Sequence, residues 1–353
     1  MLTDLWERWV GGRAPNAARV SAALEGKDFP PALAARFSEY LATSGDRELT
    51  RIRPFELADA WHADRTTVLR LFLSATRAGL LNLSWDVVHP ACKGRTNASG
   101  SLEDVAGDSF CPVCDVRFEP QFDRSVEVSF RLPRLSRAAA AANAPVADLS
   151  TAATANHVTA LQDFRDLFSS EVLALGVELG IESLTVLFTD LIGSTALYTM
   201  TGDAPAFRIV HDHFTEMRDV IAMHDGAIVK TIGDAVMAVF VEPPNALSAA
   251  LALPPAVGMV RTPREPLMLR VGFHSGPCIA LRANDKLDYF GTTVNLAARI
   301  QHAAGGGEVV MSAATAANAE IAARLGALKT TTEALTFKGF AGEIPVVRVK
   351  TEV

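Results

Sequence analysis

The chain has 353 residues, enough for two or three compact domains, and 49% of them are hydrophobic, as in a globular protein with a sizeable core. Its formal net charge of −7 argues against a protein whose main task is to coat nucleic acid or an anionic membrane. No apolar run approaches the roughly 20 residues of a membrane helix, and the N-terminus lacks the apolar core of a secretory signal, so we expect a soluble, cytoplasmic protein.

Residues 1–88 are predicted to form a helical domain. Apolar residues recur at helical spacing on both sides of residues 61–66, which predict a tight turn with Asp64 or Thr66 as the N-cap of the second helix. Gly79 is a stop signal, and the apolar residues after it predict a strand. Helix, turn, longer helix and strand is the order of a winged helix-turn-helix, so we expect a winged-helix-like domain.

The second of these helices carries three arginines that could face a DNA backbone: Arg65, Arg70 and Arg77. Acidic residues in this half of the chain roughly balance the basic ones, which is unfavourable for DNA affinity. We therefore expect the domain to serve protein contact or dimerisation, and DNA binding is the less favoured alternative.

Two close pairs of potential metal ligands lie in a module predicted to span residues 89–135. His89 and Cys92 form one knuckle and Cys111 and Cys114 the other, each with two residues between the ligands. In a cytosolic chain such pairs are more often metal ligands or free thiols than disulfides, and their separation fits a zinc ribbon. Four protein ligands would close the coordination shell, so we predict a structural zinc site. The alternative is incidental free thiols and a surface histidine.

Residues 136–180 are predicted to connect two domains. The first part, up to residue 160, is mostly Ala, Ser, Thr and Asn, the composition of a linker. A helix is expected over 161–180, and we interpret it as a coupling helix into the next domain. Its first apolar side chains share one helical face: Leu161, Phe164, Leu167 and Phe168.

Strands and helices alternate over residues 181–353, which predicts mixed layers of the two. The segment 184–189 has the continuous apolar character of a buried strand. Two further strands flank Gly233-Asp234, a hairpin turn of the type that Gly and Asp favour. Helices are expected over 203–224, 245–260 and 293–303, and strands over 267–274 and 344–349.

Carboxylates stand at the edges of two of these apolar runs. Asp190 ends the strand 184–189 and precedes Leu-Ile-Gly-Ser-Thr, which is expected to open a helix whose first amides suit phosphate oxygens. Asp234, at the hairpin tip, is the natural second carboxylate. Two carboxylates that share two Mg²⁺ ions would activate a hydroxyl and stabilise a leaving phosphate. Taken singly, Asp190 could equally be a helix cap and Asp234 a turn residue.

Three segments together make the pattern specific: Phe188-Thr-Asp-Leu-Ile-Gly-Ser-Thr195, Lys230-Thr-Ile-Gly-Asp-Ala235 and Asp288-Tyr-Phe-Gly-Thr-Thr-Val-Asn-Leu-Ala-Ala-Arg299. In this order and spacing they resemble the class III adenylate/guanylate cyclase family, over roughly residues 181–350. The resemblance implies an α+β catalytic domain with a ferredoxin-like core. It also implies a homodimer with two symmetric sites, because active sites in that family form only between two such domains.

The resemblance assigns the ligands of metal and phosphate. Asp190 and Asp234 match the family's metal ligands, assisted by the Leu191 carbonyl, for two Mg²⁺ or Mn²⁺ ions in each site. Substrate would also contact the residues that follow: Ile192, Gly193, Ser194 and Thr195. Lys338 stands where family members often have a phosphate-contacting lysine, although a solvated surface lysine is nearly as good an interpretation.

The resemblance also assigns base selection and catalysis. Lys230 and Asp288 match the purine-selecting pair, and an ammonium can donate to a ring nitrogen of adenine while a carboxylate accepts from its exocyclic amine. Guanine would place a carbonyl where Asp288 needs a donor. Asn295 and Arg299 lie one helical turn apart and match the ribose-orienting asparagine and the arginine that stabilises charge on the α-phosphate.

The sequence thus predicts an adenylate cyclase that converts ATP to 3′,5′-cyclic AMP and pyrophosphate. One alternative is a guanylate cyclase, which Lys230 and Asp288 oppose. The other is a DNA-binding regulator whose cyclase domain senses nucleotide, which the intact Asp190, Asp234 and Arg299 oppose. A helical and zinc-bearing module ahead of a cyclase resembles the regulatory N-terminal domains of bacterial cyclases. We therefore expect the first half of the chain to respond to a regulatory ligand or protein partner.

Overall fold

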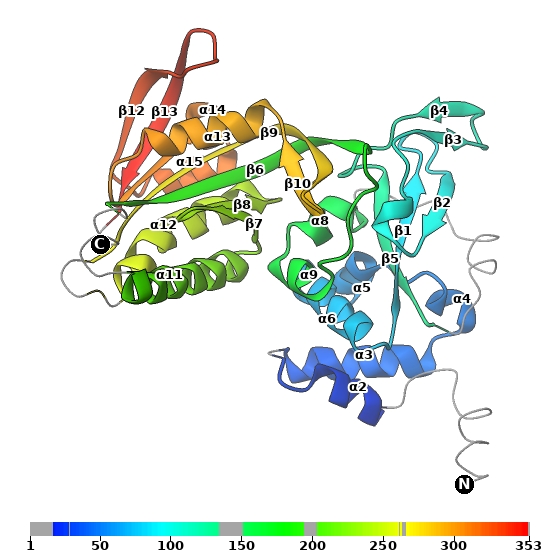
Figure 1. The fold of residues 1–353 in the computed structure, drawn as a ribbon. Coiled ribbons are helices and arrows are strands. Elements are labelled where there is room, and N and C mark those ends of the chain that lie inside the picture. Colours follow the sequence, from blue (N-terminus) through cyan, green and yellow to red (C-terminus); the bar gives the residue numbers. More distant parts are fainter. Residues whose placement is uncertain are drawn as a thin grey trace. The chain divides into compact units, whose positions relative to one another are not determined.

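The structure, a computed structural model, describes residues 17–27, 29–133, 151–193, 203–260, 262 and 266–351. The chain divides into two compact units, whose elements are drawn in Figure 1. Unit 1 contains the residues up to Val158 together with Leu167–Val177, and unit 2 contains Thr159–Asp166 and the residues from Glu178 onward. None of the helices in the described part combines the length and the apolar character that crossing a bilayer would require.

Unit 1 begins with helices that pack on a small sheet. They are α2 (Ala17–Leu24), α3 (Pro31–Thr43), α4 (Asp46–Leu49), α5 (Pro54–Ala60) and α6 (Arg65–Arg77). Helix α6 starts as predicted, because the Asp64 carboxylate accepts a hydrogen bond from the Thr67 amide at 2.7 Å and so caps the helix. Phe72 of α6 lies between Phe37 of α3 and Phe130 of the sheet, with ring centroids 5.0 and 5.1 Å away, which joins helices and sheet into one core.

The sheet of unit 1 has the strand order β2-β1-β5, and all its pairs are antiparallel. Its strands are β1 (Asn82–Val88), β2 (Arg95–Ser99) and β5 (Val126–Arg131). A short 3₁₀ turn, η1 (Leu102–Asp104), and a two-stranded ribbon of β3 (Ser109–Cys111) and β4 (Val116–Phe118) lie between β2 and β5 in the chain. The order α5, turn, α6 and strand therefore agrees with the predicted one.

The connection between the units is less helical than predicted. It contains α8 (Ala155–Thr159) and α9 (Gln162–Leu167), and no helix follows before strand β6 begins at Glu178. The expectation of a coupling helix over 161–180 is thus wrong beyond Leu167. The apolar pattern changes there, because Val172 and Leu173 are buried as consecutive residues rather than as one face of a helix.

Unit 2 is built on one sheet with the order β12-β13-β11-β9-β6-β8-β7, and β10 pairs with β9 outside this path. Strands β9 and β11 run parallel, and the other paired strands of the described sheet run antiparallel. The strands are β6 (Glu178–Ile192), β7 (Ala227–Ile232), β8 (Ala235–Phe240), β9 (Met268–Ala283), β10 (Lys286–Phe290), β11 (Glu308–Ser312), β12 (Thr330–Thr336) and β13 (Glu343–Lys350).

Helices cover both faces of this sheet, as Figure 1 shows. They are α11 (Asp203–Met223), α12 (Pro243–Gly258), α13 (Thr292–His302), α14 (Ala313–Ala316) and α15 (Ala319–Leu325). Helices α11, α12 and α15 share one core with the centre of the sheet, whereas α13 packs in a separate cluster against β11 and β13. The result is a mixed α+β fold, as the resemblance implied.

Helix α13 lies very close to strand β9, and Gly272 makes this possible. A Cβ atom on Gly272 would lie 2.3 Å from the Cα of Gln301 in α13, which is far inside van der Waals contact. Any larger residue at position 272 would therefore push the helix away from the sheet. The position of α13 matters because it carries the predicted Asn295 and Arg299.

Candidate functional site

The two predicted metal-binding carboxylates come to the same end of neighbouring strands. Asp190 follows Thr189 in β6, and Thr189 pairs with Val236 of the adjacent strand β8. Asp234 occupies the turn between β7 and β8, where Gly233 has a φ of +64° that glycine adopts without strain. The strand register thus brings together two side chains that are far apart in the sequence.

Asp190 has a cationic partner that the sequence analysis missed. Its Oδ2 accepts a hydrogen bond from Arg270 Nε at 2.9 Å and a second contact from Arg270 Nη2. Arg270 lies directly across the β6–β9 pair from Asp190. The signal was present in the sequence, because a charged residue inside the apolar strand 267–274 needs a partner when that strand is buried.

Asp234 meets a simple test for a cation ligand. Its Oδ2 is buried and has no hydrogen-bond partner among the described residues. An unpaired buried carboxylate oxygen is costly unless a cation or proton compensates it. Both contacts that Asp190 makes with Arg270 use Oδ2, so neither of them occupies Oδ1 of Asp190. Carboxylate oxygens are the donors that Mg²⁺ and Mn²⁺ prefer, so these two residues, one in β6 and one in the β7–β8 turn, fit such ions.

The segment after Asp190 continues the strand instead of opening a helix at once. Leu191 and Ile192 pair with Leu269 and Met268 of β9, so β6 ends only at Ile192. Leu191 is buried, whereas Ile192 is 47% exposed. Gly193 forms the turn that follows, with a φ of +77°. The predicted Ser194 and Thr195 lie outside the described residues.

The structure brings the predicted purine-selecting pair into direct contact. Lys230 Nζ lies 2.5 Å from Asp288 Oδ2, although Lys230 belongs to edge strand β7 and Asp288 to β10. The side chains are 39% and 14% exposed, so the pair can reach a ligand. The other carboxylate oxygen, Asp288 Oδ1, accepts a hydrogen bond from the Tyr289 amide at 2.8 Å. A bulge between Ile228 and Lys230 shifts the register of β7 just before the lysine.

Asn295 and Arg299 lie on the exposed face of α13, opposite the buried Leu296 and Ile300. No described residue forms a hydrogen bond or ion pair with either side chain, so both are available to a ligand or a second chain. Lys338 is also exposed, in the connection between β12 and β13. Its neighbour Phe337 packs in the same cluster as Leu296 and Ile300, which ties Lys338 to the helix that carries Arg299.

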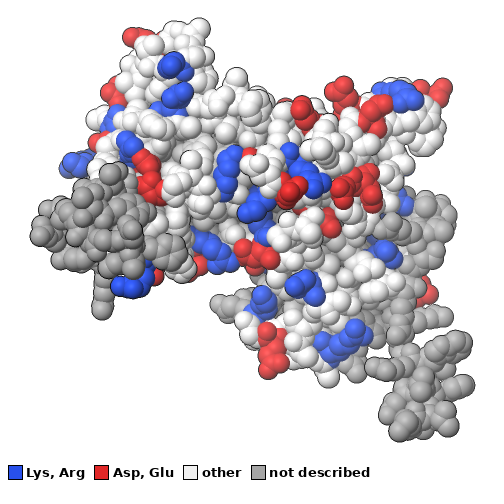
Figure 2. Space-filling view, in the orientation of Figure 1, with Lys and Arg blue, Asp and Glu red and all other residues white. Residues whose placement is uncertain are grey.

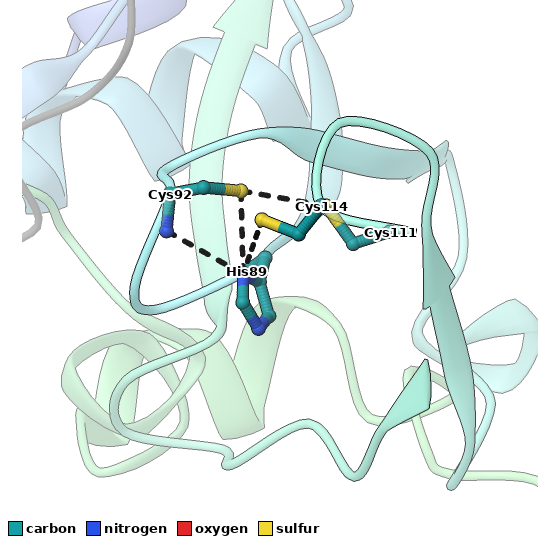
Figure 3. A group of neighbouring side chains, drawn as sticks. All are labelled: His89, Cys92, Cys111 and Cys114. Atoms are coloured by element: carbon teal, nitrogen blue, oxygen red, sulfur yellow. Dashed lines mark hydrogen bonds between the residues drawn. The ribbon is translucent and has the colours of Figure 1, made fainter. Parts of the chain in front are cut away.

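The four predicted zinc ligands of unit 1 converge (Figure 3). The donor atoms of His89, Cys92, Cys111 and Cys114 all lie within 4.8 Å of one another. The contact distances are 3.2 Å from His89 Nδ1 to Cys92 Sγ, 3.6 Å from the same nitrogen to Cys114 Sγ, and 3.4 Å between Cys92 Sγ and Cys111 Sγ. Ligands about 2.0–2.3 Å from one tetrahedral ion are about 3.3–3.8 Å apart, so the spacing fits zinc.

The backbone of this cluster supports the same interpretation. The two knuckles have equivalent turns, in which the Lys93 amide bonds to the His89 carbonyl and the Asp115 amide to the Cys111 carbonyl, both at 2.9 Å. Lys93 and Asp115 adopt matching positive φ values of 60° and 58°. The hydrogen bond with Cys114 lowers the pKa of Cys92 to about 6, and the same contact raises the pKa of Cys114 to about 12. A cation would favour the thiolate form of both.

One of the three arginines of α6 is already engaged by a carboxylate. Arg65 makes two hydrogen bonds to Asp59, at 2.9 and 2.8 Å, so its guanidinium is already paired. On the face shown in Figure 2, Lys and Arg side chains are interspersed with Asp and Glu over the described residues. Neither observation favours the DNA-binding alternative.

Two family models match the chain. Residues 178–344 match the adenylate and guanylate cyclase catalytic domain, and residues 21–180 match a family of unknown function (DUF5939). Relatives include guanylate cyclase 32E of Drosophila melanogaster, 33% identical over 38% of this chain and 13% of its own length. Human retinal guanylyl cyclase 1 is 31% identical over 34% of this chain and 12% of its own length. An uncharacterized protein of Mycobacterium tuberculosis is 35% identical over 38% of this chain and 44% of its own length. The chain thus spans less than half of each of these relatives.

Solved structures with similarity to the chain include cyclase domains. The adenylyl cyclase CyaB from P. aeruginosa is 23% identical, with a TM-score of 0.45, over 50% of this chain and 97% of that one. The guanylate cyclase domain of RhGC from Catenaria anguillulae, solved with GTP, is 24% identical, with a TM-score of 0.44, over 49% of this chain and 99% of that one.

The family match spans every predicted cyclase residue in the sequence, from Asp190 to Lys338. The match to a family of unknown function covers the helical part and the His/Cys cluster. Residues 178–344 of this chain therefore belong to the adenylate and guanylate cyclase catalytic domain family, and they follow a separate domain whose family has no known function.

Proposed function

We propose that the chain is an adenylate cyclase that converts ATP to 3′,5′-cyclic AMP and pyrophosphate. The observation that carries the choice of adenine is the contact between Lys230 and Asp288, which presents an ammonium and a carboxylate side by side on a partly exposed surface. Adenine offers a ring-nitrogen acceptor next to an amine donor, and this pattern is complementary to the pair.

The pair can bind a base without breaking its own contact. The Lys230 ammonium has three N–H donors and uses one of them on Asp288. Asp288 Oδ2 retains a second lone pair for an amine donor. Guanine would direct its carbonyl oxygen at this carboxylate and leave a partly buried charge without a donor, which discriminates against GTP.

Three groups of residues share the catalytic work in this proposal. Asp190 and Asp234, with the Leu191 carbonyl, would hold two Mg²⁺ or Mn²⁺ ions. Such ions, when bound, supply the Lewis acidity that favours attack of the ribose 3′-hydroxyl on the α-phosphate. Asn295 orients the ribose, and Arg299 stabilises the charge that develops on the α-phosphate as pyrophosphate leaves.

We also propose that two chains build each site. The side chains of Asn295 and Arg299 have no described partners, as expected for residues that act on a substrate held across an interface. Large apolar side chains are exposed beside the purine-selecting pair, with Ile232 at 52% and Phe290 at 61% exposure. Exposed apolar groups of this size next to a functional site are typical of surfaces that a partner covers.

Guanylate cyclase activity is the second candidate. It is favoured by two relatives, one from the fruit fly and one from human, both of which are guanylate cyclases. Lys230 and Asp288 remain the residues that oppose it, for the chemical reason given above.

One experiment tests the proposed reaction. Purified full-length protein is incubated with ATP and, separately, with GTP in the presence of Mn²⁺ or Mg²⁺, and products are identified by mass spectrometry. We expect cyclic AMP and pyrophosphate, and a loss of at least about 100-fold in Asp234→Asn, which keeps the shape of the side chain but removes its charge. Folded protein that forms no cyclic nucleotide from either substrate would contradict the proposal.

For unit 1 we propose a structural zinc ion on His89, Cys92, Cys111 and Cys114. The convergence of four donors at tetrahedral spacing and the two equivalent turns support it. All four coordination positions would come from the protein, so the ion would stabilise the fold and would not bind substrate.

A further inference from the structure

The chain enters unit 2 before the cyclase domain begins. It leaves unit 1 after Val158, contributes Thr159–Asp166 to unit 2, returns to unit 1 for Leu167–Val177, and only then starts strand β6. We call Thr159–Asp166 the strap. It lies upstream of the matched cyclase family, which starts at residue 178, yet its contacts are with the cyclase unit.

The middle of the strap binds strand β7 and the residue before it. The Gln162 amide donates to the Gly226 carbonyl at 3.2 Å, and Gln162 Oε1 accepts from the Ile228 amide at 2.8 Å. Strand β7 is at the edge of the sheet, so these bonds satisfy backbone groups that would otherwise be unpaired. They hold the strand at the bulge between Ile228 and Lys230, which sets the direction of the lysine side chain.

The strap also binds strand β10. Arg165 Nη1 donates to the Leu287 carbonyl at 3.1 Å. This carbonyl belongs to the peptide that links Leu287 to Asp288. The Arg165 guanidinium lies 5.6 Å from the ring centroid of Tyr289, a buried residue whose hydroxyl is 3.1 Å from Thr159 Oγ1. Asp288 is thus flanked on both sides by residues that the strap contacts.

We infer that the strap sets the position of the purine-selecting pair, and that Arg165 and Gln162 are positioning residues for base recognition. The inference rests on the proposed function. A single short segment bridges the two strands that carry Lys230 and Asp288, and the relative position of those side chains decides how well they fit the adjacent acceptor and donor of adenine. Neither residue touches the base in this account.

This role has a kinetic signature that general loosening of the domain lacks. Contacts to the base exist in the ground state and in the transition state alike, so their loss raises KM and weakens discrimination between purines while kcat changes little. A residue that only stabilised the domain would lower the amount of active protein and leave the discrimination intact.

The test compares Arg165→Ala, Arg165→Lys and a matched control, Arg324→Ala, in the full-length protein. Arg324 of α15 also donates two hydrogen bonds within unit 2, to the Pro244 carbonyl at 3.1 Å and Ser248 Oγ at 2.6 Å, but both acceptors lie in α12 and not in β7 or β10. We expect Arg165→Ala to reduce the ratio of kcat/KM for ATP to that for GTP about tenfold, with kcat for ATP within about threefold of wild type. Arg165→Lys, which can still donate to the Leu287 carbonyl, should recover part of the ratio, and Arg324→Ala should not change it.

An unchanged ratio in folded Arg165→Ala, or an equal fall in Arg324→Ala, would overturn the inference. Failure of the proposed function is a separate outcome. A wild-type protein that prefers GTP would refute the adenine assignment. The inference about the strap would then be judged by whether its variants shift the ratio of kcat/KM for ATP to that for GTP toward a value of one. If the wild-type protein forms no cyclic product, the ratio of the binding affinities for ATP and GTP is compared among the same variants instead. These affinities are measured by competition of ATP and GTP against N-methylanthraniloyl-ATP.

Discussion

Lys230 and Asp288 stand 58 positions apart in the chain and 2.5 Å apart in the fold. The sequence predicted both residues as a pair because they lie in motifs with a specific order and spacing. It did not predict what holds them, since Gln162 and Arg165 lie in a segment with no motif and act through backbone groups of other strands. Arg270 escaped prediction for a similar reason. Its partner Asp190 is set by strand register, which sequence spacing alone does not give.

A buried histidine in unit 1 predicts a dependence of stability on pH. His157 accepts a hydrogen bond from the Thr154 amide at Nδ1, 3.2 Å away, and its ring meets the Phe55 ring edge to face at 5.2 Å. Burial, aided by the nearby Arg65, lowers the pKa of His157 from 6.5 to about 4. The folded state therefore disfavours the charged imidazole.

The sign follows from proton binding. Between pH 6.5 and pH 4 the unfolded chain binds a proton at His157 that the folded chain does not, so stability present above pH 6.5 is lost as the pH falls. The free energy of unfolding of unit 1 should fall by up to about 3 kcal/mol over this range from this residue alone. Urea unfolding followed by the fluorescence of buried Trp85 at several pH values measures it. In His157→Gln, whose amide oxygen can still accept from Thr154, the free energy of unfolding should depend less on pH between pH 4 and pH 6.5. An equal pH dependence in the wild-type protein and the variant would refute the assignment.

At the scale of elements, local sequence patterns predicted the central strands and the three longest helices of unit 2, but not strands β10, β11 and β12 or helices α14 and α15. The hairpin at Gly233-Asp234 and the helix around Asn295 lie where expected, because each carries its own turn or amphipathic signal. The connection was predicted poorly. Residues after Leu167 were expected to be helical, but they pack as irregular chain, and tertiary contacts rather than local propensity decide such segments.

The ribbon of β3 and β4 is too short to be stable by its own hydrogen bonds. Each strand has three residues, and Phe110, Val113 and Val116 are exposed, so it buries little apolar surface. We therefore predict that the zinc ion supplies the missing stability.

Freshly purified protein should contain about one zinc ion per chain, measured by plasma mass spectrometry. Cys111→Ser should lose the metal and lower the unfolding temperature. Cys278→Ala, which removes a thiol in unit 2, should retain the metal. Zinc-free wild type, or equal zinc loss in both variants, would rule out the proposed site.

At the scale of the whole molecule, a site built by residues of two chains predicts that two inactive variants can complement each other. If Asp190 acts from one chain and Arg299 from the other, then Asp190→Asn and Arg299→Ala proteins should each be inactive. Their mixture should recover about a quarter of wild-type activity, because half of the dimers would be mixed and each would have one intact site of two.

The matched control mixes Asp190→Asn with Asp234→Asn. Both changes fall on the metal-binding side, so every dimer of this mixture lacks an intact site and no activity should return. Recovery in the control, or none in the Asp190→Asn and Arg299→Ala mixture, would contradict a shared site.

The central claim is that this cyclase domain selects adenine through Lys230 and Asp288. Direct competition tests it: full-length protein receives equal concentrations of ATP and GTP with Mn²⁺, and the two cyclic products are quantified together. The account predicts cyclic AMP in at least about tenfold excess, and a loss of that excess in Asp288→Asn, whose amide can donate to the guanine carbonyl. Cyclic GMP in equal or greater amount from the wild-type protein would contradict it.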